Sequence, residues 1–304
     1  MHPKNIQYFT KITLILVLFF HFSNAFAQDT NSKFLKIRKF KISELPTKVE
    51  ETSALNFFQQ NLFTLNDSGN SAELHQLNPE NGTLVNTLPI SGIQNFDWEA
   101  LSNDEKYFYI GDIGNNWGTR TDLKIYKISI DSLKHEGEIK FYYPEQKEFI
   151  KKPQANDFDA ESMVFIKGNL HIFTKEWSSY NTTHYVVSTE TSEESVPAKI
   201  LEKFHLGYIA TDAAYFDGKL YIVGYTKKME VYLSVFQEDD LGLFFSKNSK
   251  KFFIGMSTGI GQIEGIAVNN NGVYISGERF VIKPFDVPQR LYFIPKNKFE
   301  KFAK

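Results

Sequence analysis

Short apolar runs, separated by polar turns that often carry glycine, recur along the chain after residue 50. Each run has the length and alternation of a β-strand, and helical periodicity is weak throughout. The runs fall into five repeats, and the second strand of each repeat is centred on one of these triplets: Leu62-Phe63-Thr64, Phe108-Tyr109-Ile110, Leu170-His171-Ile172, Leu220-Tyr221-Ile222 and Val273-Tyr274-Ile275. The pattern predicts a closed β fold built from repeats.

One oxygen-bearing residue stands ten positions before the middle of each triplet: Ser53, Glu99, Glu161, Thr211 and Glu264. The steps between them, 46, 62, 50 and 53 residues, are typical of four-stranded propeller blades. A polar insertion from Pro144 to Asp157 accounts for the longest step. We therefore predict an all-β chain that forms a single five-bladed β-propeller. A six-bladed propeller remains open, because one blade can lose its repeat signature.

The last repeat offers three clear strands, which end at Gln289 to Pro295. Before the first repeat, residues Phe34 to Ile42 alternate apolar and basic side chains, as an edge strand does. We expect this N-terminal strand to become the fourth strand of the last blade. Such pairing would close the ring and remove a free edge.

The N-terminus has the features of a secretory signal peptide. Lys4 and Lys11 precede an apolar run from Ile12 to Phe20, and Ala25 and Ala27 occupy the small-residue positions of a cleavage site. The run is too short to span a bilayer. We expect residues 1–27 to be the leader and residues 28–304 the propeller domain, exported to the periplasm or the medium without a membrane span.

Composition narrows the functional classes. The 34 basic and 36 acidic residues are mixed along the chain, which argues against a polymeric nucleic acid as partner. The chain has no cysteine, so disulfides, thiolate metal sites and cysteine catalysis are excluded. We expect a monomer whose partner is a small molecule, a glycan or an envelope protein.

The five repeat residues point to a cation site. Inner strands of a propeller line its central channel, so Ser53, Glu99, Glu161, Thr211 and Glu264 are expected to converge there. Three carboxylates at low dielectric must be protonated, ion-paired or metal-bound. An all-oxygen ligand set favours calcium, and we expect one axial ion. The alternative is a hydrogen-bonded network neutralised by Lys or Arg.

The segments around these residues resemble the channel of the five-bladed calcium-activated nucleotidases, the animal apyrase family. The resemblance rests on Glu51-Thr-Ser53, Asp97-Trp-Glu99, Asp159-Ala-Glu161, Ala210-Thr211-Asp212 and Ile263-Glu264-Gly. In that family Ser, Glu, Glu, Ser and Glu hold one calcium on the axis, which implies the same role here, with Thr211 in fourth place. Some segments are also similar to exported bacterial propellers of the phytase-like and SdiA-regulated types.

The loops after the second strands should surround the same end of the channel, and rigidly held loops often bind ligands. One hypothesis is a calcium-dependent hydrolase of phosphate anhydrides or esters, with Asp67 or Asp112 as base and Arg120, Lys175 or Arg279 at an anionic substrate. The resemblance supports it weakly, because Asn66 replaces one of two adjacent Asp and Thr174-Lys175-Glu176 replaces a pair of arginines.

The other hypothesis, which we favour, is a calcium-stabilised binding propeller without chemistry. Its ligand or envelope partner would contact polar and aromatic loop residues, among them Asn66, Asn115, Trp117, Trp177 and Tyr225. An incomplete set of phosphate-binding groups favours binding over hydrolysis, since Lys is a point charge and Glu176 repels phosphate.

Overall fold

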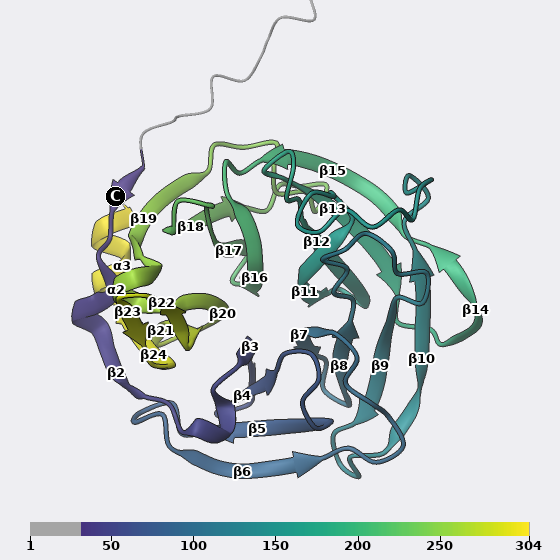
Figure 1. Ribbon diagram of the computed structural model, residues 1–304, viewed down its shortest axis with the longest axis horizontal. Coiled ribbons are helices and arrows are strands. Elements are labelled where there is room, and N and C mark those ends of the chain that lie inside the picture. Colours follow the sequence, from purple (N-terminus) through teal and green to yellow (C-terminus); the bar gives the residue numbers. More distant parts are fainter. Residues whose placement is uncertain (1–31, 304) are drawn as a thin grey trace, which may run out of the picture. The chain divides into compact units, whose positions relative to one another are not determined.

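The computed structural model describes residues 32–303, which belong to one compact unit. The expected leader, residues 1–27, lies outside the described residues. Five sheets form the blades of a β-propeller, each with four blade strands, and two of the sheets carry a fifth strand. Figure 1 shows the inner strands β3, β7, β11, β16 and β20 around the centre. The five-bladed prediction is confirmed.

The blades follow one another along the chain. Blade one contains β3 (Thr52–Phe58), β4 (Asn61–Asn66), β5 (Glu73–Leu77) and β6 (Leu84–Pro89). Blade two contains β7 (Trp98–Asn103), β8 (Tyr107–Asp112), β9 (Lys124–Ser129) and β10 (His135–Tyr142). Blade three contains β11 (Asp159–Ile166), β12 (Asn169–Lys175), β13 (Asn181–Ser188) and β15 (Lys199–His205). Blade four contains β16 (Ile209–Phe216), β17 (Lys219–Tyr225), β18 (Glu230–Gln237) and β19 (Lys250–Met256). Blade five contains β20 (Gln262–Asn269), β21 (Gly272–Glu278), β24 (Arg290–Pro295) and β2 (Lys41–Glu44).

An N-terminal strand does complete the last blade, but its bounds differ from those predicted. Phe34 to Ile42 is not one strand: β1 (Lys33–Phe34) pairs in parallel with β19 of blade four, and β2 pairs antiparallel with β24 of blade five. Between them the 3₁₀ helix η2 (Ile37–Phe40) carries the chain from one blade to the next. Burial explains the break, because Leu35 and Ile37 are both inserted into the core between these blades.

Several elements lie outside the five-blade pattern. Strand β14 (Ser192–Pro197) adds a parallel fifth strand to blade two, although its polar sequence gives little strand signal. Strands β22 (Phe280–Ile282) and β23 (Phe285–Val287) form a hairpin. Besides η2, the described helices are η3 (Thr47–Val49), α2 (Ser257–Ile260) and α3 (Lys296–Ala303). Among the described residues, no helix has the length and apolar character needed to cross a membrane.

The buried apolar side chains lie between neighbouring blades and do not form one central hydrophobic core. Each of the five hydrophobic clusters joins two neighbouring blades, and one of them joins blade five to blade one through residues such as Leu291 and Leu62. The sheets therefore pack as a closed ring, and the channel along its axis is left to polar side chains.

Candidate cation site in the central channel

A β-bulge in each inner strand positions the channel side chains. In four blades the pairing register shifts by one residue, and the extra, unpaired residue is Glu99, Glu161, Thr211 or Glu264. In blade one the shift lies one position after Ser53, at Ala54, whose φ is 63°. A bulged residue leaves the alternation of its strand, which re-aims its side chain. Four of the five repeat residues in the sequence are thus bulge residues, and the fifth, Ser53, directly precedes a bulge.

The structure brings these side chains close together, although not as five equal ligands. The hydroxyl of Ser53 lies 3.4 Å from Oε2 of Glu99 and donates to it. Burial raises the pKa of both Glu99 and Glu161. The charge of Glu161 raises the pKa of Glu99 further, and the charge of Glu264 raises that of Glu161 against the opposing charge of Lys175. The hydroxyl of Thr211 instead donates to the backbone carbonyl of Ile263 at 2.7 Å. All five side chains are buried.

Lys175 is the cation of this network. As the last residue of β12 it pairs with Asp159 of β11, and its ammonium forms a buried ion pair with Oε1 of Glu161. The same ammonium lies 4.7 Å from the ring centre of Trp177 and 5.7 Å from that of Tyr225. Burial opposes its charge, but Glu161, Tyr225 and Glu264 raise the pKa of Lys175 well above its ordinary value. Lys175 is therefore protonated inside the channel.

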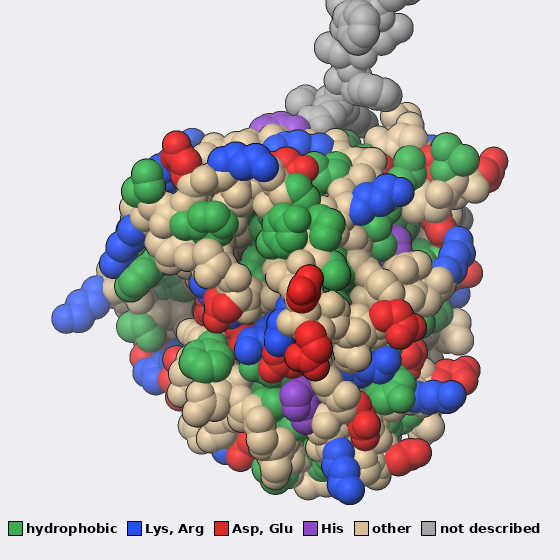
Figure 2. Space-filling view, turned by 90° about the vertical axis from the view of Figure 1, so that its right-hand side faces the viewer, with side chains coloured by type: hydrophobic (Ala, Val, Ile, Leu, Met, Phe, Trp, Pro, Cys, Tyr) green, Lys and Arg blue, Asp and Glu red, His purple; other side chains and the backbone are tan. Residues whose placement is uncertain are grey.

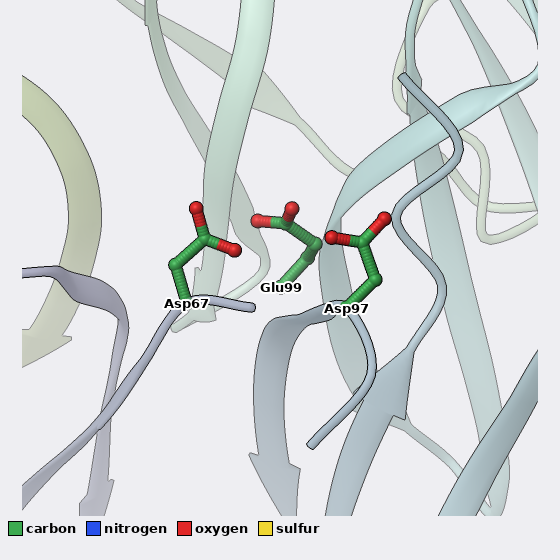
Figure 3. Close-up of side chains that lie close together, drawn as sticks. All are labelled: Asp67, Asp97 and Glu99. Carbon is green, nitrogen blue, oxygen red and sulfur yellow. The ribbon is translucent and has the colours of Figure 1, made fainter. Parts of the chain in front are cut away.

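Three other carboxylates, Asp67, Asp97 and Glu99 of blades one and two, form no ion pair within residues 32–303. Carboxylate oxygens of Asp67, Asp97 and Glu99 all lie within 4.8 Å of one another. Figure 3 shows the three side chains side by side. Asp67 follows β4, Asp97 precedes β7, and Glu99 is the bulge of β7. Burial, together with the charges of Asp67 and Asp159, raises the pKa of Asp97 to about 7. Burial and the charges of Glu161 and Asp67 raise the pKa of Glu99 well above its ordinary value.

Two further observations show excess acceptors in the channel. Oε2 of Glu161 is buried and, within the described part of the chain, has no hydrogen-bonding partner. Glu278, at the end of β21, shares the side-chain amide of Gln262 with Glu264. Burial and the charge of Glu264 raise the pKa of Glu278 well above its ordinary value. Neither Glu278 nor Asp97 belongs to the repeat column in the sequence.

The predicted base Asp112 has a different role in the structure. Its side chain is fully buried at the end of β8, and it forms an ion pair with Arg120 at 2.7 Å. Arg120 also contacts Asp122 at 3.0 Å and donates to the carbonyl of Gly114 at 3.1 Å. Asp112 therefore holds Arg120 in place, with no exposed oxygen for a substrate. The other predicted base, Asp67, is half-buried in the acidic cluster.

Two predicted loop contacts are mainly structural. Asn115 is buried, donates its backbone N–H to Asp159 and accepts a bond from the backbone N–H of Arg120. Asn66 is also buried and donates to the carbonyl of Lys48 at 2.9 Å. Trp117, by contrast, is 54% exposed, and Lys151 lies over its ring at 3.5 Å.

The three predicted anion-binding cations do not point at one substrate. Arg279 is exposed and pairs with Glu50 and Asp286, each at 2.9 Å. Arg120 pairs with Asp112, and Lys175 pairs with Glu161. On the side of the molecule that Figure 2 shows, acidic and basic side chains are interspersed, with no extended basic patch.

A surface pocket adjoins the acidic cluster. Its volume is about 480 Å³, and its lining includes Phe96, Asp97, Asn115, Trp117 and Arg120. Asp97 belongs to both the pocket and the acidic cluster. A ligand in this pocket would therefore lie beside whatever neutralises the cluster.

Comparisons with known proteins add little to this geometry. No protein-family model and no curated protein matches the chain. Among solved structures, a DUF4623 family protein from Bacteroides eggerthii is 12% identical, with a TM-score of 0.48 over 90% of this chain and 64% of its own. The hydrazine synthase of Kuenenia stuttgartiensis is 8% identical, with a TM-score of 0.40 over 90% and 70%. A putative 6-phosphogluconolactonase from Bacteroides uniformis is 11% identical, with a TM-score of 0.36 over 84% and 72%.

These likenesses are too distant to carry an argument about function. The resemblance to the calcium-activated nucleotidases and to the phytase-like propellers has no support from them and rests on the short motifs in the sequence.

Proposed function

We propose that this chain is an exported propeller that binds calcium at the carboxylate end of its channel and holds a ligand or an envelope partner on the adjoining loops. The observation that carries the proposal is the uncompensated cluster of Asp67, Asp97 and Glu99. Like charges this close cannot all ionise without a counter-cation. The buried, unpartnered Oε2 of Glu161 supports the proposal independently.

The donor set fits calcium. Carboxylate and hydroxyl oxygens surround the cluster, with Ser53 donating to Glu99, and hard oxygen ligands are those that calcium prefers. Because Lys175 already neutralises Glu161, the cation is expected towards blades one and two. Asp67, Asp97, Glu99 and Ser53 would hold it. This site departs from the five-ligand axial ion that the sequence predicts.

Binding is better supported than hydrolysis. The hydrolase hypothesis needs Asp112 as a base or free cations at a phosphate, whereas Asp112 is buried and Arg120, Lys175 and Arg279 are each paired within the chain. The pocket beside the cluster presents the exposed ring of Trp117. An aromatic face of this kind can bind a ligand without chemistry.

Isothermal titration of purified residues 32–304 with calcium chloride, after treatment with chelator, tests the proposal. The wild type should bind one equivalent. Asp97→Asn keeps the shape and removes a charge, so it should weaken binding at least tenfold, about 1.4 kcal/mol. Asp131→Asn, in an exposed turn, is the matched control and should leave binding unchanged. No calcium binding by the wild type, or equal binding by Asp97→Asn, would refute the proposal.

A further inference from the structure

The end of the channel away from the carboxylates contains a second cavity. Its volume is about 460 Å³, within the range of small-molecule sites. Its walls are the later halves of the inner strands, from Leu55 to Phe57 in β3 and from Ala267 to Asn269 in β20, for example. Since a strand rises about 3.3 Å per residue, Asn56 lies roughly 10 Å along the strand from Ser53.

Asp212 separates this cavity from the carboxylate end. Its side chain, from β16 of blade four, accepts hydrogen bonds from the backbone N–H groups of Leu55 at 3.1 Å and Ile266 at 2.7 Å. These donors belong to blades one and five, so the bonds cross the channel between its two ends. These bonds lie between the second cavity and the carboxylate end of the channel.

The lining of this cavity has an unusual composition for the chain. None of its twenty lining residues is Asp, Glu, Lys, Arg or His, although 23% of the whole chain is Asp, Glu, Lys or Arg. Seven of the twenty are Asn or Gln, and four are Phe or Tyr. Without charges the cavity has no counter-ion for an ionic ligand. Carboxamides both donate and accept hydrogen bonds, as hydroxyl groups do.

Part of this lining is held rigidly. The side-chain amide of Asn56 donates to Asn103 at 2.6 Å, which links blades one and two. The hydroxyl of Ser102 accepts the backbone N–H of Phe165 at 2.8 Å, which links blades two and three. Because these hydrogen bonds already fix the wall, a ligand that binds there would cost little conformational entropy of the lining side chains.

Other carboxamides at the cavity are free to bind. Gln59 and Gln60 form the turn between β3 and β4, and Asn270 lies in the turn between β20 and β21. Within residues 32–303, the side chains of these three residues have no hydrogen-bonding partner. Free amides at the mouth of a rigid, uncharged cavity supply the donors and acceptors that a neutral polar ligand needs.

We propose that this cavity binds an uncharged saccharide. Hydroxyl groups of the sugar would pair with the free carboxamides, and the aromatic side chains Phe57, Tyr215 and Phe216 would provide apolar faces for its C–H groups. An anionic ligand finds no cation here, and a cationic ligand finds no carboxylate in the lining. A neutral peptide is the competing occupant, and the experiment below distinguishes the two.

The test uses purified residues 32–304 and titration calorimetry with neutral oligosaccharides of glucose, xylose, mannose, galactose and N-acetylglucosamine. At least one should bind with a dissociation constant of about 1 mM or tighter. The double substitution Gln60→Ala and Asn270→Ala should weaken binding at least tenfold. The near-isosteric pair Gln60→Glu and Asn270→Asp should weaken it similarly, because each loses a donor and gains a charge. All four substitutions lie in turns, and melting curves check that the variants fold.

Two control variants should keep sugar binding. Asn86→Ala removes an exposed carboxamide from β6 and should bind the sugar as the wild type does. Asp97→Asn should also keep sugar binding, which separates this site from the proposed calcium site. Failure of every neutral saccharide, unchanged binding in both double variants, or binding of blocked neutral tetrapeptides in place of sugars would overturn the proposal.

Discussion

Bulged residues carry the chemistry of the channel. The sequence identified Glu99, Glu161, Thr211 and Glu264 because each bulge residue lies ten positions before the middle of the second strand of its blade. Spacing did not show how their charges are compensated. We expected Lys175 in a loop, but it is the last residue of β12, and its ammonium reaches Glu161. The end of a strand depends on pairing with its neighbour, which local sequence does not encode.

Substitution of Lys175 tests the buried ion pair. Lys175→Met leaves Glu161 buried without its partner, so we expect the free energy of unfolding to fall by about 3–5 kcal/mol. Adding Glu161→Gln to this variant should recover part of the loss. The control is Lys167→Met, because the exposed ammonium of Lys167 pairs with Glu238 and is expected to contribute less than about 1 kcal/mol. Chemical denaturation measures all three, and equal stability of Lys175→Met and wild type would contradict the buried pair.

The raised carboxylate pKa values predict a pH dependence. In the folded protein burial and the charges of Asp67 and Asp159 raise the pKa of Asp97 from 3.8 to about 7, so the folded state holds this proton more tightly than the unfolded chain does. The resulting stability is present below about pH 4 and is lost as pH rises through about 7. Glu99 shifts in the same direction.

Melting of the chelator-treated protein between about pH 5 and about pH 8 measures this effect. We expect the melting temperature to fall across that range and the fall to be smaller in Asp97→Asn. Calcium should reduce the loss, because it replaces the proton as counter-charge. A melting temperature that rises steadily with pH in the metal-free wild type would be inconsistent with these shifts.

Among the elements, the inner strands and turns were the most predictable, since alternation and turn residues mark them directly. The N-terminal closure was predicted in outline, because a blade with three clear strands needs a fourth. The division of this segment into β1, η2 and β2 was not predicted, because its alternating apolar and basic residues are also typical of a single strand. The separation depends on Leu35 and Ile37 entering the core between blades four and five. Strand β14 carries too few apolar residues to be recognised.

Truncation tests this closure. A chain beginning at Leu45 loses β1, η2 and β2, which exposes the edge of β24 and removes Leu35 and Ile37 from the core. Each buried side chain contributes roughly 1.5–3 kcal/mol, so we expect a large fall in melting temperature or failure to fold. A chain beginning at Lys33 keeps all three elements and is the control. Equal melting temperatures would show that the segment is a dispensable tail.

For the propeller as a whole, the five-bladed ring followed from the repeat, but the asymmetry of its channel did not. Lys175 forms an ion pair with Glu161 of blade three, whereas Asp67, Asp97 and Glu99 of blades one and two form no ion pair among the residues that the structure describes. The opposite end of the same channel is neutral and rich in carboxamides. Side chains from distant repeats meet only when the ring closes. The sequence therefore predicts neither the uneven distribution of charge at the carboxylate end nor the difference between the two ends of the channel.

An anomalous difference map tests the proposed cation site most directly. Crystals of residues 32–304 grown with calcium, and then with a lanthanide in its place, would locate the ion. We predict one strong peak in the channel, bonded to carboxylate oxygens of Asp67, Asp97 and Glu99 and absent from crystals of Asp97→Asn. A wild-type channel without a peak, or one whose ion lies away from these three carboxylates, would contradict the proposal.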